Sequence, residues 1–188
     1  MVLSQESPII TYFDPDQTKI KEEYYIKSGS QLLEGPYTAY YEDGQIKEQG
    51  SYLANNPVGT WEYFYENGNM KMTGEIRDNQ NYGHWQYFYE NSNPSMEGAL
   101  YQGIKEGIWQ YYYENGGLKS RGEYQQGRRT GIWNWFYESN QLKSQIFYQG
   151  DRGAYKEFYN SGKLKASGTK INDKNEGAWE YYYENGTI

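Results

Sequence analysis

The chain has 188 residues and a net charge of −7, and it contains no cysteine and a single histidine, His84. This composition excludes a disulfide framework and a cysteine-based metal site, and it leaves almost no ligands for zinc. Aliphatic residues are scarce while 24 tyrosines are present, so most of the apolar surface that drives folding must come from aromatic rings.

Residues 1–34 are a degenerate opening of the pattern that fills the chain. Residues 1–6 contain no basic segment followed by an apolar run, so we expect no signal peptide and a cytoplasmic protein. Terminal repeats are atypical because they cap a stack. We therefore interpret residues 1–34 as a capping repeat before an array over residues 35–188, the two forming one continuous domain.

From residue 35 onward, a motif that begins with glycine recurs at nearly constant spacing. The steps between the leading glycines are 24, 24, 24, 24, 22 and 24 residues, by subtraction. The leading glycines are Gly35, Gly59, Gly83, Gly107, Gly131, Gly153 and Gly177. A fixed period of this length indicates a repeat architecture.

Each repeat has the composition of one β-hairpin when its residues are numbered from the leading glycine as position 0. Positions 2 to 6 are rich in aromatic residues, as strands are. Positions 8 and 9 are Asn-Gly or Asp-Gly in most copies, which predicts a two-residue type I′ turn. Positions 11 to 17 form the return strand, and a looser turn leads to the next repeat. The 22-residue step is interpreted as a shortening of this second turn, at residues 149–152. The sequence thus predicts an all-β, elongated array of antiparallel hairpins in a single meandering sheet.

The predicted turn fixes which residues face each other across the hairpin. Position 6 should face position 11, position 4 should face 13, and position 2 should face 15, all on one buried face. Position 2 is mostly tryptophan and position 15 mostly glycine, so we expect Trp109 to cover Gly122 of its own hairpin. Some copies depart from this pattern: Pro36 and Tyr37 replace x-Trp in the first clear copy, Ile146 replaces the glycine at position 15, and Glu157 replaces the tyrosine at position 4.

The opposite face is polar apart from position 5, which is aromatic in every repeat. These rings should face the lysine that usually occupies position 12, a cation–π geometry. Aromatic anchors on a polar face are typical of a protein interface, and a structural ladder is the alternative. The candidate partner-binding residues are Tyr40, Phe64, Phe88, Tyr112, Phe136, Phe158 and Tyr182.

The motif Gly-x-Trp-x-Tyr-x-Tyr-Glu-Asn-Gly, followed by Leu-Lys-x-x-Gly-x-Tyr, resembles the MORN-repeat variant found in YwqK-like bacterial antitoxin proteins. The resemblance spans about residues 35–188, with a weak copy before them. It implies an elongated all-β sheet, no catalysis, and binding to another macromolecule.

No catalytic constellation emerges from the sequence, and we expect no cofactor and no metal. His84 occupies a freely varying position without a base, nucleophile and orienting group around it. The glutamate that recurs at position 7 lies at the hairpin tips, where exposure to solvent accounts for it. A loose basic cluster at Lys105, Lys119, Arg121, Arg128 and Arg129 is interpreted as a solvated turn region.

Charge is distributed unevenly along the chain. Residues 1–100 carry 15 acidic and 6 basic side chains, a balance of −9, and residues 101–188 carry 10 acidic and 12 basic, a balance of +2. This acidity argues against nucleic acid and membrane lipid as partners. It favours a basic protein partner, and the leading hypothesis is an antitoxin or immunity protein that blocks a basic toxin by stoichiometric binding. The alternatives are a carbohydrate- or choline-binding cell-wall repeat, and a structural scaffold or fragment of a larger protein.

Overall fold

The computed structural model describes residues 7–188, which consist of strands and turns and contain no helix. The prediction about a signal peptide concerns residues 1–6 and lies outside the described residues. The chain divides into two compact units, Met1–Ser92 and Asn93–Ile188, called here the N-terminal and the C-terminal unit. The prediction of one continuous domain stays a prediction.

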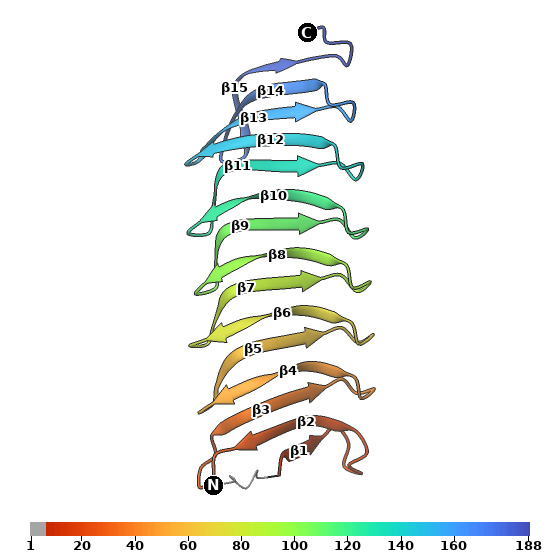
Figure 1. Ribbon diagram of the computed structural model, residues 1–188, viewed down its shortest axis with the longest axis vertical. Helices are drawn as coiled ribbons and strands as arrows, with labels where there is room; N and C mark the ends of the chain where they lie inside the picture. Colours follow the sequence, from red (N-terminus) through yellow and green to blue (C-terminus); the bar gives the residue numbers. More distant parts are fainter. Residues whose placement is uncertain (1–6) are drawn as a thin grey trace. The chain divides into compact units, whose positions relative to one another are not determined.

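The N-terminal unit is an antiparallel meander in which each strand pairs with the next along the chain, as Figure 1 shows. Its strands are β1 (Ile9–Tyr12), β2 (Ile20–Ile26), β3 (Leu33–Tyr40), β4 (Ile46–Leu53), β5 (Asn56–Phe64), β6 (Met70–Arg77) and β7 (Gln80–Phe88).

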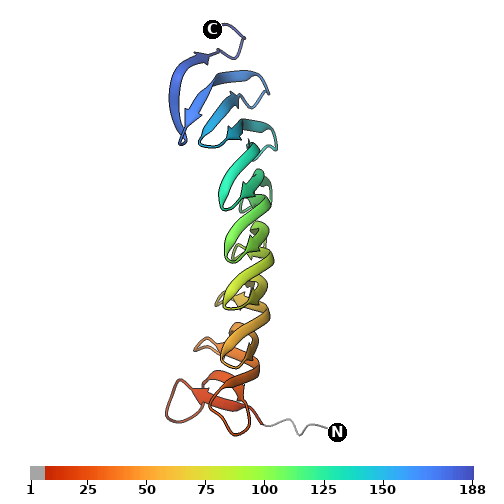
Figure 2. The ribbon, with the colours of Figure 1, turned by 90° about the vertical axis from the view of Figure 1, so that its left-hand side faces the viewer.

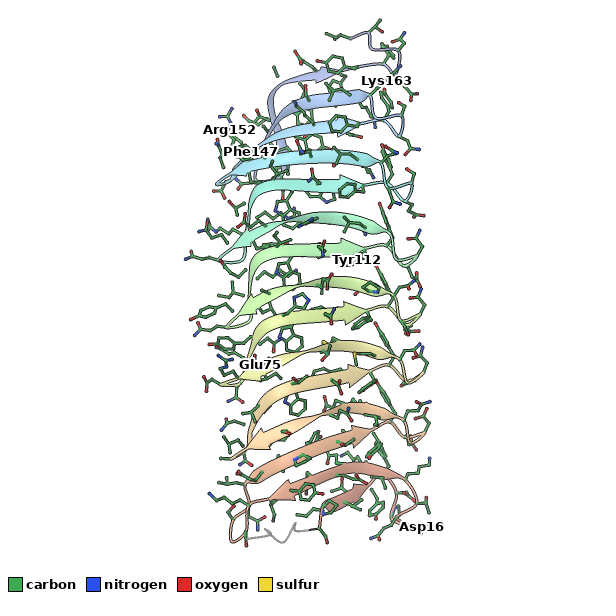
Figure 3. All side chains as sticks on the ribbon, in the orientation of Figure 1. Asp16, Glu75, Tyr112, Phe147, Arg152 and Lys163 are labelled. Atoms are coloured by element: carbon green, nitrogen blue, oxygen red, sulfur yellow. The ribbon has the colours of Figure 1, made fainter. Side chains whose placement is uncertain are left out.

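The C-terminal unit repeats this arrangement, each strand pairing with the next along the chain. Its strands are β8 (Pro94–Tyr101), β9 (Ile104–Tyr112), β10 (Leu118–Gln125), β11 (Arg128–Phe136), β12 (Leu142–Gln149), β13 (Arg152–Phe158), β14 (Leu164–Ile171) and β15 (Lys174–Tyr181). Figure 3 places Lys163 at a first turn and Arg152 beside a second turn, at opposite margins of this sheet. The predicted all-β fold of antiparallel hairpins is confirmed.

The first turn of each repeat is a three-residue loop, and the prediction of a type I′ turn there is wrong. The amide of Gly116 donates to the carbonyl of Tyr113 at 2.9 Å, and the amide of Tyr113 donates to the carbonyl of Gly117 at 2.8 Å. Gly116 has a φ of 86°, but Asn115 before it does not have the positive φ that a type I′ turn requires. Asn115 stays in a type I turn because its Oδ1 accepts a hydrogen bond from the amide of Gly117, at 2.9 Å.

The type I′ turns occur instead at the second turn of the repeat. Gln126 and Gly127 have φ values of 51° and 76°, and the flanking Gln125 and Arg128 pair directly. These turns also use asparagine and aspartate, which tolerate a left-handed backbone. The residue pairs with two positive φ values are Ala54-Asn55, Asp78-Asn79, Gln102-Gly103, Gln126-Gly127 and Asn172-Asp173.

The register agrees with the prediction in the middle of the hairpin and differs near the first turn. Position 2 pairs with position 15 and position 4 with position 13, as between Trp109 and Gly122. Position 6 was expected to face position 11, and this is wrong: Leu118 at position 11 pairs with Tyr112 at position 5. The wider turn causes the change, because it introduces an irregularity between Leu118 and Ser120.

Each long strand bulges where its Gly-x-Trp segment passes the preceding return strand. Between β10 and β11 the pairing skips Gly122, which faces residues 131–133. Gly131 opens this bulge with a φ of 61°, a conformation that glycine adopts without a steric penalty. A bulge bends its strand, and Figure 1 shows the bend at the start of β9 and β11. Figure 2 shows from the side that the strands of each unit curve out of a flat plane.

The bulge lays the tryptophan of one repeat over the glycine of the repeat before it. A Cβ atom added to Gly122 would overlap the ring of Trp133. The prediction that Trp109 covers Gly122 is therefore wrong, although these two residues do pair, because the bulge turns the next tryptophan inward over the return strand. The equivalent pairs are Gly50 under Trp61, Gly74 under Trp85, Gly98 under Trp109 and Gly168 under Trp179.

Three of these tryptophans, Trp85, Trp109 and Trp133, are among the most deeply buried side chains, whereas Trp179 is half-buried. Trp109 is 0% and Trp133 is 1% exposed. The indole N–H of Trp133 donates to the carbonyl of Glu123 at 2.9 Å, and that of Trp109 donates to the carbonyl of Ala99 at 3.0 Å. These two indoles keep their polar atoms satisfied while their rings supply the core of a sheet that has few aliphatic residues. The indole nitrogens of Trp61 and Trp179 are also buried but have no hydrogen-bond partner.

The tyrosine at position 6 ties each hairpin to the next one. Its hydroxyl donates to the backbone carbonyl of the position-5 residue in the following repeat. Tyr137 reaches the carbonyl of Phe158 at 2.8 Å, for example. The other pairs are Tyr41 to Phe64, Tyr65 to Phe88, Tyr113 to Phe136 and Tyr159 to Tyr182, at 2.7 to 2.8 Å. This bond explains why position 6 holds tyrosine rather than phenylalanine.

The 22-residue repeat keeps its second turn and loses its bulge. Gln149 pairs with Arg152 across a two-residue turn, and from there β12 and β13 pair without any shift of register. The prediction of a shortened turn is wrong: the two missing residues are those that a bulge would need. Ile146 replaces the usual glycine at position 15 because no tryptophan ring lies over it, and its side chain instead packs close to Gly153.

We expect Gly122→Val to destabilise the protein much more than Glu123→Val. A side chain at Gly122 would displace the Trp133 ring, and misfit of this kind typically costs ~1–3 kcal/mol. Glu123 is exposed and acts through its backbone carbonyl, which the substitution leaves in place. Thermal unfolding followed by circular dichroism measures the difference, and equal melting temperatures would show that the ring does not lie over Gly122.

Replacing Tyr137 by phenylalanine should lower the free energy of unfolding by ~1 kcal/mol, because the carbonyl of Phe158 loses its hydroxyl partner. Tyr183→Phe is the matched control, since Tyr183 occupies the same position of the last repeat and is 69% exposed. Urea unfolding of both variants provides the comparison. Equal stability of the two would mean that the tyrosine hydroxyl contributes nothing between hairpins.

Candidate binding site

The position-5 rings lie half-buried on the polar face of the sheet. In the C-terminal unit, the hydroxyl of Tyr112, labelled in Figure 3, donates to Oε1 of Glu97 at 2.6 Å and accepts from Nε2 of Gln110 at 3.1 Å. In the N-terminal unit, the hydroxyl of Tyr40 donates to Oε2 of Glu23 at 3.2 Å. The half-buried set is Tyr40, Phe64, Phe88, Tyr112, Phe136, Phe158 and Tyr182. Rings within a polar surface have the composition of an interface, and a binding role for them stays a prediction.

The lysine at position 12 does not face the position-5 ring, contrary to the prediction. Nζ of Lys119 lies 5.6 Å from the ring centroid of Tyr113, at position 6, and Nζ of Lys71 lies 5.5 Å from that of Tyr65. The reason is the irregularity beside the first turn, which pairs position 5 with position 11 and moves position 12 toward the turn tyrosine.

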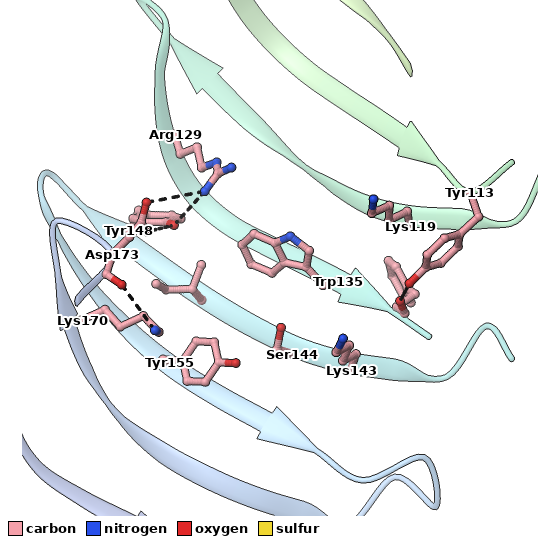
Figure 4. Close-up of a pocket in the computed structure, with 12 residues that line it drawn as sticks. Tyr113, Lys119, Arg129, Trp135, Lys143, Ser144, Tyr148, Tyr155, Lys170 and Asp173 are labelled. Carbon is pink, nitrogen blue, oxygen red and sulfur yellow. Dashed lines mark hydrogen bonds and ion pairs between the residues drawn. The ribbon is translucent and has the colours of Figure 1, made fainter. Parts of the chain in front are cut away.

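A cleft of about 320 Å³ opens in the C-terminal unit, between β10 and β14. Its walls combine aromatic rings with cationic side chains, as Figure 4 shows. The residues around it are Tyr113, Lys119, Arg129, Trp135, Phe136, Lys143, Ser144, Ile146, Tyr148, Tyr155, Lys170 and Asp173. The volume falls in the range of ligand pockets.

The cleft exists because the aromatic ladder is interrupted at the 22-residue repeat. Up to that point the rings follow one another, with 6.2 Å between the centroids of Tyr111 and Trp133 and 5.8 Å between those of Trp133 and Trp135. The next ring contact within residues 93–188 joins Tyr155 to Trp179, at 5.6 Å. Without the bulge, no tryptophan is turned inward between Trp135 and Tyr155, and the space it would fill remains open.

One end of the cleft holds a network of charged and hydroxyl groups beside the second turns. The hydroxyl of Tyr148 donates to Oδ1 of Asp173 at 2.7 Å, and Nη1 of Arg129 lies 3.7 Å from Oδ2 of the same carboxylate. Nζ of Lys170 donates to Oδ1 of Asn175 at 3.0 Å. Burial and the bond to Asp173 raise the pKa of Tyr148, so its hydroxyl remains a donor at neutral pH.

The other end of the cleft holds two exposed lysines near the first turns, Lys119 on β10 and Lys143 on β12. Each lies over a tyrosine ring, at 5.6 and 5.5 Å from the centroid. Within residues 93–188, no carboxylate forms an ion pair with either lysine. The floor between the two ends consists of Trp135, Ser144 and Tyr155.

The sequence indicated this site only indirectly. The predicted basic cluster is divided in the structure, since Lys119 and Arg129 line the cleft whereas Lys105 covers the Trp109 ring at 4.2 Å. Burial lowers the pKa of Lys105. Lys143 and Lys170 were not part of the predicted cluster. The signals that could have located the cleft are the 22-residue step, the departure at Ile146 within that repeat, and the departure at Glu157 in the next repeat.

The histidine and the recurring glutamates considered as catalytic candidates lie on the surface of the sheet. His84 is exposed, and the glutamates at position 7 are exposed at the hairpin tips. Among residues 7–188, no three or more His, Cys, Asp or Glu side chains gather where a metal ion could be held. The same residues form no helix long and apolar enough to cross a membrane.

A family model described as a MORN repeat variant matches six segments of the chain. They are residues 33–54, 57–78, 105–126, 129–149, 152–169 and 175–188. Together these segments make up more than half of the sequence, and the chain belongs to the MORN-repeat variant family. Repeats of this kind are generally non-catalytic modules that bind proteins or membranes. A comparison with curated proteins found no match.

Alkaline pH should destabilise the fold between about pH 10 and 12. Burial raises the pKa of Tyr63 to about 12, and burial together with the bond to Glu97 raises that of Tyr112 to about 12, from the ordinary value of 10.0. The unfolded chain ionises first, so the stability is fully present below pH 10 and is lost as pH rises toward 12. Melting temperatures measured across this interval should fall.

The matched measurement is the difference in phenolate absorbance between the native protein and Tyr112→Phe during an alkaline titration. The group that is missing from the variant should ionise near pH 12. A midpoint near 10 would contradict the hydrogen bond between Tyr112 and Glu97.

Proposed function

We propose that this chain is a non-enzymatic protein-binding module whose partner docks on the position-5 rings. One observation carries the proposal: a half-buried aromatic ring recurs on the polar face in every repeat. Such rings supply apolar anchors that lose little conformational entropy on binding, and polar neighbours such as Glu97 and Gln110 form a hydrated rim.

In its finer form the proposal is an antitoxin or immunity protein that covers the active surface of a basic toxin in the cytoplasm. Two features of the sequence support it. The repeat pattern resembles that of YwqK-like antitoxins, and the balance of −9 over residues 1–100 complements a basic surface. Binding through an extended surface would block a toxin stoichiometrically, without any chemistry on the part of this chain.

Binding of choline by a cell-wall module is less well supported than protein binding. A quaternary ammonium group needs an aromatic cage without competing cations. The aromatic cleft of the C-terminal unit instead contains Lys119, Arg129, Lys143 and Lys170, which would repel it. A purely structural scaffold remains the alternative in which the position-5 rings only stabilise the sheet.

The test is co-expression with the product of the neighbouring gene. If that product is toxic, the native chain should restore growth and bind it at one fixed stoichiometry. The double variant Phe64→Ser and Phe88→Ser should fold, because its tryptophan core is intact, and should lose binding by at least tenfold, since hot-spot rings contribute ~2 kcal/mol or more each.

The matched control is the double variant Ile108→Ser and Ile132→Ser. Both isoleucines are 53% exposed and lie outside the position-5 set. Retained binding in this control together with loss of binding in the phenylalanine variant assigns the interface to the position-5 rings, called here the position-5 stripe. Full binding by the folded phenylalanine variant would move the interface elsewhere, and a non-toxic neighbouring product that does not bind the chain would refute the antitoxin form of the proposal.

A further inference from the structure

We propose that the cleft of the C-terminal unit binds an acidic peptide segment in extended conformation, in which carboxylates flank an apolar side chain. This site lies on the face of the tryptophan ladder, because Ile146 and Tyr148 at the cleft pack in one cluster with Trp133. It is distinct from the position-5 stripe, with which it shares only Phe136. The inference rests on the proposed protein-binding role only in that the ligand is a peptide.

The charge of the cleft is the first argument. Four cations, Lys119, Arg129, Lys143 and Lys170, surround a space that contains one carboxylate, Asp173. Asp173 is 64% exposed and sits 3.7 Å from Arg129, so it neutralises that guanidinium only in part. An anionic ligand is the natural complement of such a surface.

The placement of the cations is the second argument. Lys119 and Lys143 lie at the first-turn end, and Arg129 and Lys170 at the second-turn end, as Figure 4 shows. Lys119 and Lys143 are two strands apart, which corresponds to about 9–10 Å. That separation exceeds the size of a single carboxylate or phosphate, whereas side chains three residues apart in an extended peptide span about 10 Å. The site therefore fits several carboxylates on one extended chain better than one compact anion.

The floor of the cleft is the third argument. Between the two cationic ends lie Trp135 and Tyr155, which offer an apolar surface to a side chain that enters from above, with Ile146 buried against them. Trp135 and Tyr155 are half-buried, so each ring has an accessible part. A ligand with an apolar group between its carboxylates would use the floor and both ends at once, and this combination discriminates it from a simple polyanion.

The site also depends on the irregular repeat, as a comparison with a regular repeat of the described residues shows. Lys71 lies over Tyr65 just as Lys119 lies over Tyr113, at 5.5 and 5.6 Å. However, the aromatic ladder beside Lys71 is regular, because Trp85 of the following repeat covers Gly74 of the same repeat as Lys71. The lysine–tyrosine pair alone is therefore a structural feature of the family motif, and the broken ladder converts it into part of a binding site.

The experiment is isothermal titration calorimetry of the full chain with a capped pentapeptide in which a central leucine is flanked on each side by two glutamates. Saturable binding is expected. The matched peptide with glutamines in place of the glutamates should not bind, and one with glycine in place of leucine should bind more weakly. The double variant Lys119→Gln and Lys143→Gln should bind roughly tenfold more weakly, the effect of removing two exposed charge pairs.

Lys71→Gln is the control variant, since it removes a lysine from the same position and the same type of ring contact without a cleft. Its affinity for the peptide should equal that of the native chain. The single variant Lys119→Gln gives the reference for one lost charge at the cleft. If Lys71→Gln lost as much affinity for the peptide as Lys119→Gln, the proposal would be overturned, because only the total charge of the chain would matter. Equal binding of the glutamate and glutamine peptides, or no binding of either, would also overturn it.

Two further probes separate other sources of negative charge. Inorganic phosphate and vesicles containing phosphatidylglycerol should bind weakly, and their binding should not depend on the apolar floor that receives the leucine of the peptide. Competition by millimolar phosphate that abolishes peptide binding, or vesicle binding that is stronger than peptide binding and is lost in the lysine double variant, would assign the cleft to a compact anion or to a membrane instead. None of these results depends on Phe64 and Phe88. The proposal for the cleft and the proposal for the position-5 rings can therefore be refuted independently of each other.

Discussion

The structure depends on one steric relationship, the packing of a tryptophan ring on a glycine that has no side chain to hold it away. Trp133 over Gly122 is the clearest case, and the same contact recurs in both units. It requires a bulge, because only a strand that bends at Gly131 can lay its tryptophan over the strand before it. A sheet so poor in aliphatic residues obtains its core from this contact, which recurs at Gly50, Gly74, Gly98, Gly122 and Gly168 and is absent at Ile146.

The same constraint explains the site. A bulge uses two residues more than a regular ladder does, and the 22-residue repeat lacks those two. Tyr155 then pairs in regular register with Ile146, and no ring fills the space beside Trp135. A change that looks like a minor length variation in the sequence therefore interrupts the ladder, opens a cleft and exposes an apolar floor between three lysines and one arginine. Of the position-5 residues only Phe136 lines the cleft, and the other position-5 rings lie on the opposite face.

Much of the fold could be predicted from the sequence, because the period and the alternation of residue types are strong signals. The hairpins, the strand order within each unit and the pairing of Trp109 with Gly122 follow from them. The turn types could not be predicted in this way. Asn115-Gly116 has the composition of a type I′ turn, yet the side chain of Asn115 bonds to the backbone and favours a wider loop. Gln126-Gly127 adopts type I′ without the usual signal. The cleft could not be predicted for a related reason. It results from the loss of a bulge, and a bulge forms by pairing between neighbouring hairpins rather than from a local sequence motif.

The central claim is that the ring over each glycine comes from the following repeat. The most direct measurement is the nuclear Overhauser effect between the Hα protons of Gly122 and tryptophan ring protons in the solution NMR spectrum. Contacts to the indole of Trp133, with the Gly122 Hα resonances shifted strongly upfield by that ring, are the result expected from the structure. Contacts to the indole of Trp109 instead, with unshifted Hα resonances, would contradict the bulge and with it the origin of the cleft.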